Sequence, residues 1–275
     1  MCKMTLYQCL FLVFILLKDV FALKDVVLTI RPEVVERGSF ATLICSYDLE
    51  GATLYYVKWY RGTHEFYRYT PSERPTTKLF PFGAINVDVN RSNATQVVLT
   101  DIDFKLSGNF SCEVTTDEEP ASTETAVQSM LVVQLPEFFP TISVGRDPLD
   151  YGDVLRANCT SPPARPAAKL KFLLNDLLVA STPPLSPRRS QEVQWSDLSL
   201  ELPLHEYHFS RGKLILRCVA QVAGIYHEEA VLELPSVRDP VPAKVSADDS
   251  ASFAPCEIVL QIFFILLLRI AGVMN

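Results

Sequence analysis

The residues of this chain with the clearest chemistry are its cysteines, because two thiols that lie close together can be oxidised to a disulfide. The chain contains seven cysteines. Cys2 and Cys9 lie in an apolar segment at the N-terminus, and Cys256 precedes an apolar segment at the C-terminus. The body of the chain keeps the other four, which are Cys45, Cys112, Cys159 and Cys218.

Four cysteines allow three pairings. We expect the pairs Cys45–Cys112 and Cys159–Cys218, because each half of the chain has a strand pattern of its own. None of the four has the C-x-x-C spacing of a zinc or redox site, so the predicted role is structural. The first pair would close a loop of 67 residues, which stabilises a fold by about 4 kcal/mol in the chain-entropy model.

The histidines offer the other candidate chemistry, in the segment His205-Glu206-Tyr207-His208. A zinc peptidase motif needs two histidines four positions apart on a helix, with a glutamate as the base. Here the histidines are three apart and follow Pro203, so we expect surface histidines. The sequence also has no G-x-S-x-G elbow and no glycine-rich phosphate loop. It therefore predicts neither an enzyme nor a cofactor.

The composition excludes a further class of function. Charged residues make up 21% of the chain, its net charge is −7 and its pI is about 5.2. An acidic chain without clusters of lysine and arginine lacks the electrostatic footprint of a nucleic-acid-binding protein. The length of 275 residues permits about two domains after targeting segments are removed.

The first pair of cysteines lies in a recognisable order of strands. Ala41–Cys45 alternates between apolar and polar residues, as does the strand that contains Trp59, and Gly108–Cys112 ends at the second cysteine. In immunoglobulin sandwiches a disulfide joins the two sheets, and a buried tryptophan packs against it. The segment 23–135 is therefore predicted to be an immunoglobulin variable-type domain.

The pattern repeats in weaker form beyond a proline-containing junction at 134–140, where we place the domain boundary. Val154–Cys159 and Gly212–Cys218 alternate, and Phe172 stands where the core tryptophan is expected. The two cysteines are 59 residues apart, which leaves less room for central strands. A second, constant-like or intermediate immunoglobulin domain is predicted over 137–236. The predicted fold class is all-β, with two tandem β-sandwiches.

Both ends of the chain resemble targeting segments. A basic start, a short apolar run and small Ala22 predict a secretory signal peptide over 1–22, since the run is too short for a membrane helix. A polar linker over 237–257 precedes a hydrophobic tail over 258–275, which contains Arg269. We expect a glycosylphosphatidylinositol anchor attached around 248–250. A single membrane pass and plain secretion stay open as alternatives, and each makes the protein extracellular.

Acceptor patterns for N-linked glycans agree with secretion. The Asn-x-Ser/Thr pattern occurs at Asn90, Asn93, Asn109 and Asn158. Asn90 and Asn93 are too close for both to be occupied. The strand phase set by the neighbouring cysteines points Asn109 and Asn158 outward.

The first half of the chain resembles more than a general immunoglobulin domain. Its most specific segments are Cys45–Gly51, Leu54–Arg61 and Glu65–Pro71. They resemble the beaten path family of insect neuronal immunoglobulin proteins, and the resemblance covers Leu23–Leu234. It implies two immunoglobulin domains after a signal peptide, in a protein that is secreted or attached to a membrane. It also implies binding to sidestep-family immunoglobulin receptors in axon guidance and synaptic partner choice.

The binding surface should lie on the sheet that carries the aromatic residues of the first domain. With Trp59 turned inward, its neighbours on the strand turn outward, and tyrosine and arginine are common interface anchors. The predicted partner-binding residues are Tyr56, Tyr60, Tyr67, Arg68 and Tyr69. The alternative is that some of them pack in the core. The second domain lacks such a cluster, which favours a spacer role.

A different functional class also fits the sequence. A secreted immunoglobulin-type immune molecule would bind microbial or small ligands, and it would do so through its loops. Contact through the tyrosine-bearing sheet favours pairing with a cell-surface protein instead.

Overall fold

The structure is a computed structural model that describes residues 23–83, 85–184 and 192–237. The predicted signal peptide, the anchor-attachment region and the hydrophobic tail lie outside the described residues. Within the described ranges, no helix has both the length and the apolar character needed to cross a membrane.

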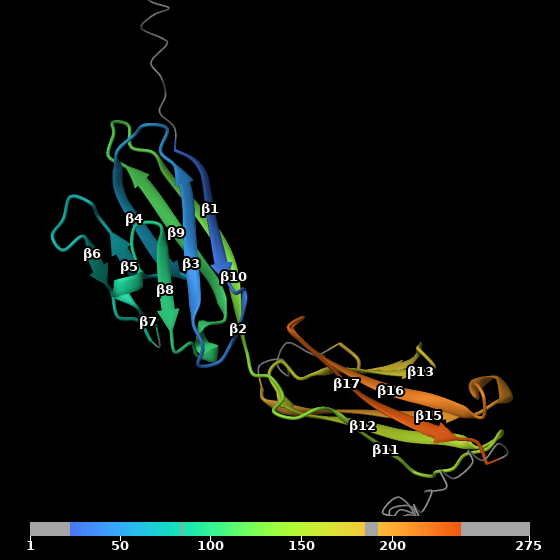
Figure 1. Ribbon diagram of the computed structural model, residues 1–275. Coiled ribbons are helices and arrows are strands. Elements are labelled where there is room, and N and C mark those ends of the chain that lie inside the picture. Colours follow the sequence, from blue (N-terminus) through green and yellow to red (C-terminus); the bar gives the residue numbers. More distant parts are fainter. Residues whose placement is uncertain (1–22, 84, 185–191, 238–275) are drawn as a thin grey trace, which may run out of the picture. The chain divides into compact units, whose positions relative to one another are not determined.

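In the described part of the chain up to Val133, two sheets form a sandwich (Figure 1). The first has the order β1-β3-β8-β7, with β1 (Lys24–Arg31), β3 (Ala41–Asp48), β8 (Gln96–Thr100) and β7 (Asn86–Val87). The second has the order β2-β10-β9-β4-β5-β6, with β2 (Val34–Glu36), β10 (Thr123–Val133), β9 (Gly108–Thr116), β4 (Leu54–Arg61), β5 (His64–Tyr69) and β6 (Thr77–Leu79). Two short 3-10 helices are η1 (Val89–Arg91) and η2 (Phe104–Leu106). Strands β5 and β6 extend the second sheet beyond β4, as variable-type domains do.

The described residues from 141 to 235 form the second sandwich (Figure 1). One sheet has the order β11-β12-β15, with β11 (Thr141–Val144), β12 (Val154–Ala164) and β15 (Gln194–Pro203). The other has the order β14-β13-β16-β17, with β14 (Leu177–Ser181), β13 (Lys169–Leu174), β16 (Lys213–Val222) and β17 (Tyr226–Pro235). The 3-10 helix η4 (Glu206–His208) precedes β16. Strand β14 pairs with β13, so it joins the sheet of the second cysteine. The prediction of two tandem immunoglobulin-like sandwiches is confirmed.

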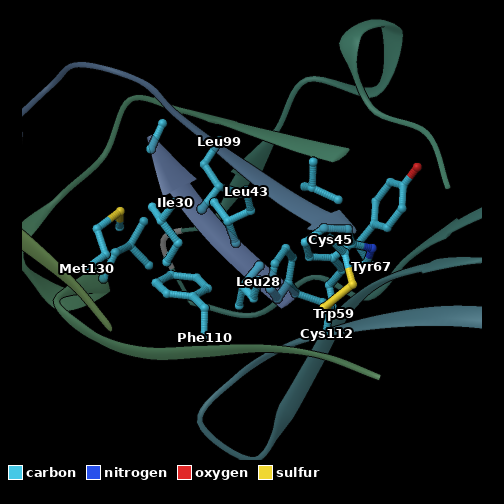
Figure 2. Close-up of a cluster of buried hydrophobic side chains, with 14 of the residues drawn as sticks. Leu28, Ile30, Leu43, Cys45, Trp59, Tyr67, Leu99, Phe110, Cys112 and Met130 are labelled. Atoms are coloured by element: carbon cyan, nitrogen blue, oxygen red, sulfur yellow. A yellow bond between two sulfur atoms is a disulfide. The ribbon is translucent and has the colours of Figure 1, made fainter. Parts of the chain in front are cut away.

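The core of the first sandwich forms around the predicted disulfide between Cys45 and Cys112 (Figure 2). Cys45 comes from β3 of one sheet and Cys112 from β9 of the other, so the bond joins the two sheets. Trp59 on β4 lies directly opposite Cys112 in the strand register and is completely buried. Apolar residues at alternate positions of both sheets therefore meet around this cystine.

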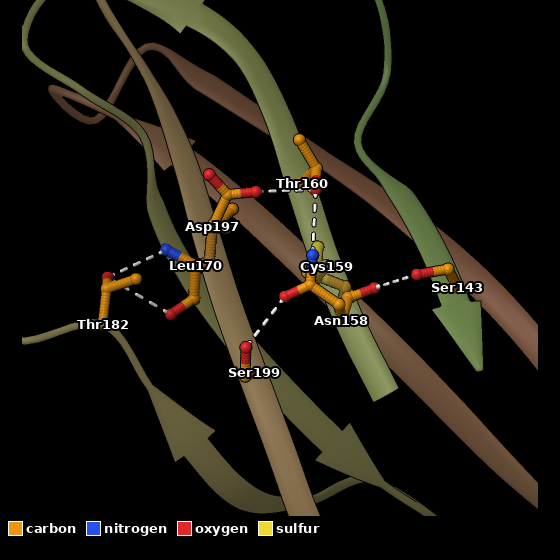
Figure 3. The surroundings of a disulfide bond; sticks show 9 residues. Ser143, Asn158, Cys159, Thr160, Leu170, Thr182, Asp197 and Ser199 are labelled. Atoms are coloured by element: carbon orange, nitrogen blue, oxygen red, sulfur yellow. Dashed lines mark hydrogen bonds between the residues drawn. A yellow bond between two sulfur atoms is a disulfide. The ribbon is translucent and has the colours of Figure 1, made fainter. Parts of the chain in front are cut away.

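The second sandwich repeats this plan with a smaller ring. The predicted disulfide between Cys159 and Cys218 is present, and Phe172 lies opposite Cys218 in the register. The outer side of the β11-β12-β15 sheet carries a polar network around Asn158 (Figure 3). Ser199 Oγ donates to Asn158 Oδ1 at 3.0 Å, and Asn158 Nδ2 donates to Thr160 Oγ1 at 3.2 Å.

Candidate interaction surface

Strand β4 sets the orientation of the side chains at the candidate site. Val57 and Trp59 are completely buried, so the residues between and beside them point to the other side of the pleated strand. Tyr56, Lys58 and Tyr60 therefore lie on the outer side of the second sheet, and all three are half-buried. The predicted outward orientation of Tyr56 and Tyr60 is confirmed.

The strand register extends this outer surface over the neighbouring strands. Residues that lie directly opposite each other on paired strands share a side of the sheet. Lys58 pairs with Glu113 of β9 and with Arg68 of β5, and Glu113 pairs with Thr125 of β10. We call this surface the tyrosine face, and it consists of Tyr56, Lys58, Tyr60, Glu65, Arg68, Ser111, Glu113, Thr115, Thr123, Thr125 and Val127.

Opposite charges lie at the centre of the tyrosine face. Lys58 Nζ is 3.5 Å from Glu113 Oε1 and 4.0 Å from the centroid of the Tyr56 ring. The Tyr60 hydroxyl donates to the same Glu113 carboxylate at 3.4 Å. Burial alone would lower the pKa of Lys58, but the contacts with Tyr56, Tyr60 and Glu113 outweigh it and raise that pKa. These contacts hold two tyrosine rings and an ammonium group in defined positions.

Arg68 is held in a similar way beside this centre. Its guanidinium donates to both oxygens of Glu65 at 2.7 Å and 2.9 Å, a bidentate pair. It also lies 5.2 Å from the centroid of the Phe80 ring. The hydrogen bond to Glu65 is the main cause that raises the pKa of Arg68, so the group is charged at any physiological pH.

The β9–β10 part of the tyrosine face carries smaller side chains. Its residues beyond Glu113 are serine, threonine and valine, and the Thr115 and Thr123 hydroxyls lie 2.9 Å apart. Val127 is 62% exposed, and the residue that lies opposite it on β9 is the small Ser111. The face is therefore bulky over β4 and β5 and flat over β9 and β10.

Two of the predicted partner-binding residues do not lie on the tyrosine face. Tyr67 pairs with Trp59 and Tyr69 pairs with Val57, so both point toward the inner side of the sheet. Tyr67 is completely buried beside the disulfide (Figure 2). Its hydroxyl donates to the Asn93 carbonyl at 3.2 Å. Tyr69 is partly buried and packs against the same core. The prediction is wrong for these two residues, because a bulge between Trp59 and Tyr60 shifts the phase of β5.

Sequence reasoning also missed residues that belong to this surface. Glu113 could have been found, because it directly follows the inward-facing Cys112 and must point outward. Phe80 follows β6 and lies under Arg68, but nothing local to the sequence indicates that contact. Leu79 pairs with the inward-facing Tyr67, whereas Lys78 pairs with Arg68, so Lys78 lies on the same outer side as Arg68.

The four glycan acceptor asparagines differ in their surroundings. Asn90, Asn93 and Asn109 are exposed, whereas Asn158 is half-buried in its polar network. Asn109 lies two residues before Ser111 on β9, so it points to the same side as the tyrosine face and borders one end of it. Whether these positions carry glycans stays a prediction.

The histidine segment forms η4 and not an α-helical metal motif. His208 Nδ1 accepts a hydrogen bond from the His205 backbone N–H at 3.0 Å, which occupies one ring nitrogen. Burial, and then the nearby His205, lower the pKa of His208. Among the described residues, no group of three or more metal-ligating side chains could hold a metal ion.

No protein-family model matches the chain, and no curated protein matches it in sequence. Solved structures do match in fold. The structure of murine CEACAM1b has a TM-score of 0.56 and 17% identity, and the match covers 77% of this chain and 98% of that chain. A chain from the complex of a mouse coronavirus receptor-binding domain with its murine receptor has a TM-score of 0.54 and 17% identity, over 78% of this chain and 100% of that one. At these identities the likeness shows the fold alone, which is that of a tandem immunoglobulin-like protein.

Proposed function

We propose that this protein is an extracellular recognition protein that binds another cell-surface protein through the tyrosine face. The observation that carries the proposal is the arrangement of Tyr56, Tyr60 and Arg68 on one exposed sheet. Each ring or guanidinium is held by a charged neighbour, either Lys58, Glu113 or Glu65. Tyrosine and arginine dominate the binding energy of protein interfaces.

The ion pairs also lower the cost of binding. An interface side chain that is immobilised on association costs about 0.5–1.5 kcal/mol of conformational entropy. Tyr60 and Arg68 already have defined hydrogen-bond partners in the free chain, so part of this cost is met before a partner arrives. A preorganised face of this kind favours binding of a folded surface over capture of a flexible ligand.

The partner that we propose is an immunoglobulin receptor of the sidestep family, in axon guidance and synaptic partner choice. What supports it is the resemblance of the segment Cys45–Pro71 to the beaten path family. The same segment contains Tyr56, Tyr60 and Arg68. We further propose that the hydrophobic tail directs membrane attachment, by a lipid anchor or a single pass, and that the mature protein acts outside the cell.

The test is a binding screen of the soluble ectodomain against extracellular immunoglobulin receptors, with sidestep-family proteins included. Once a receptor is found, Tyr60→Ala should weaken its binding by about thirtyfold, the effect of losing an anchor worth about 2 kcal/mol. Tyr207→Ala is a matched control, because Tyr207 is 76% exposed but lies on η4 of the second sandwich. It should leave the affinity unchanged.

A further variant controls for a glycan beside the face. Asn109→Gln removes the acceptor at the end of the tyrosine face, so binding should be kept or increased. Unchanged receptor affinity in correctly folded Tyr60→Ala would reject the tyrosine face as the binding surface. It would favour the alternative of a secreted immune molecule that binds through its loops.

A further inference from the structure

The tyrosine face has two halves that differ in size. Tyr56, Lys58 and Tyr60 project from β4, whereas Ser111 and Thr115 flank Glu113 on the adjacent strand β9. Because β4 and β9 are the central pair of strands β10-β9-β4-β5, the border between the halves runs between them, along the strand direction. Two copies of such a surface can be placed face to face and related by a half turn about an axis along this border. The raised half of each copy then lies over the flat half of the other.

The charges follow the same division. Lys58 is on the raised half and Glu113 is on the flat half, and they lie opposite each other at the same height in the register. We consider a second copy placed face to face, with a two-fold axis parallel to the strands and midway between β4 and β9. This operation places β4 of each copy over β9 of the other. Lys58 of one copy then faces Glu113 of the second copy, and the reverse contact forms as well.

The neighbouring positions fit this arrangement too. At the height of Tyr60, the register places Ser111 on β9 and Val127 on β10. Tyr60 of one copy would therefore lie over Ser111 of the second, and Glu65 would lie near exposed Val127. Face-to-face sheets keep their strand directions within about 30°, so residues close to the axis keep this correspondence. At this height the larger Tyr60 and Glu65 thus meet the smaller Ser111 and Val127.

From these observations we propose that the tyrosine face binds the same face of a second copy of this chain. The inference rests on the proposed function, because it assigns an occupant to the same surface. Symmetric association needs a self-complementary patch, and the exchanged Lys58–Glu113 pairs provide it. Each lysine and each glutamate would form one contact within its copy and one across the interface, in a network of four charges.

The direction of pairing also follows from the charges. An axis that lies across the strands would place β4 over β4, with Lys58 against Lys58 and Glu113 against Glu113. Like charges in contact across an interface are unfavourable by several kcal/mol. An axis along the strands avoids this repulsion, so the two copies lie face to face with their corresponding strands running in the same direction.

Charge reversal provides the test, measured as self-association of the full ectodomain by analytical ultracentrifugation. Lys58→Glu places two carboxylates together within and between copies, and Glu113→Lys places two ammonium groups together. Each single variant should weaken self-association at least about tenfold. In an equimolar mixture of the two variants, every contact across the interface is again between opposite charges. The mixture should regain association to within about threefold of the wild type, although neither variant regains its internal pair.

The double variant, Lys58→Glu with Glu113→Lys, restores both kinds of charge pair and should associate more strongly than either single variant. Circular dichroism checks that each variant is folded. A wild-type ectodomain that stays monomeric at about 100 μM would overturn the proposal. Its dissociation constant would then be larger than that of weakly associating proteins. A mixture of folded single variants that does not associate would also overturn the proposal. If the wild type is monomeric but Tyr60→Ala still weakens receptor binding, only the self-pairing fails and the proposed function stands.

Discussion

In the first sandwich an aromatic ring lies opposite the second cysteine of the disulfide, and in the second sandwich another ring takes the same place. Trp59 pairs with Cys112 and Phe172 pairs with Cys218, so the two cores share one plan. The outer sides of the same sheets do not. The strand that carries Trp59 presents Tyr56, Lys58 and Tyr60 to the outside, and the one that carries Phe172 presents Lys169, Lys171 and Leu173.

This difference supports the first sandwich as the location of the proposed binding surface. On the second sandwich, Leu173 is followed across the sheet by Arg217 and then by Val231, which is 52% exposed. Arg217 pairs with Asp176 in the turn after β13 and not with a residue of the sheet. The face therefore holds no tyrosine anchors. Since the pleat separates the inner side from the outer side, a shared core leaves the outer residues free to differ.

The largest expected effect tests whether the cores are as similar as the register indicates. Replacing Cys45 and Cys112 by alanine should destabilise the first sandwich by about 4 kcal/mol, and replacing Cys159 and Cys218 should cost the second nearly as much. The closed loops of 67 and 59 residues differ little on a logarithmic scale. Denaturant unfolding measures both losses.

The two sandwiches can be followed separately in that experiment, because the chain has two tryptophans. Trp59 is buried in the first sandwich, and Trp195 is 60% exposed on the second. In a Trp195→Phe background, the tryptophan fluorescence comes from Trp59 alone and reports on the first sandwich. If only one of the two cysteine variants lost free energy of unfolding, the two disulfides would not stabilise their sandwiches equally despite the shared plan of the cores.

The next effect separates the core side of the first sheet from its outer side. Tyr67→Ala should destabilise the first sandwich by about 3 kcal/mol, because it removes a completely buried ring. Tyr60→Ala should cost about 1 kcal/mol or less, since Tyr60 is half-buried on the outer side. Denaturant midpoints compare the two variants. Equal losses would contradict the inward assignment of Tyr67.

The smallest effect is a pH dependence between pH 5 and pH 7, which we expect for the second sandwich because it contains His208. The pKa of His208 is lowered in the folded chain by burial and by His205, so the unfolded chain binds a proton more readily. The stability is therefore complete above the unfolded pKa of about 6.5 and decreases as the pH falls through the folded value. Unfolding of the second sandwich should thus begin at lower denaturant at pH 5 than at pH 7.

His208→Asn is the matched control, because an asparagine oxygen can replace Nδ1 as the acceptor of the His205 N–H but does not titrate. It should reduce the difference between the two pH values. An unchanged difference would assign the pH dependence to other titratable groups.

Much of the fold follows from local patterns in the sequence. Cys45, Trp59 and Cys112 each lie on an alternating strand. Because these three residues point inward, the residues directly before and after them must point outward. This is why both disulfides and the outward orientation of Tyr56 and Tyr60 were predicted correctly. The same logic applied to the strand of Cys112 leads to Glu113.

The candidate site was harder to predict where the pattern depends on strand pairing. Between Glu65 and Tyr69 the sequence contains no cysteine or tryptophan to fix the phase, and two adjacent residues, Phe66 and Tyr67, are both buried. The bulge opposite them is a property of the β4–β5 pair and not of either strand alone. The contact of Arg68 with Phe80 depends on the return of the chain through β6 and is equally invisible in the sequence.

The polar network of the second sandwich bears on the order of events during biosynthesis. Asn158 and Thr160 belong to one acceptor triplet, and the residue between them is Cys159, which is bonded to Cys218. Once that bond closes, the triplet is fixed in β12 between two other strands, and the asparagine amide is occupied. An oligosaccharide would therefore have to be transferred to Asn158 before oxidation. The two modifications would then be in kinetic competition on the nascent chain.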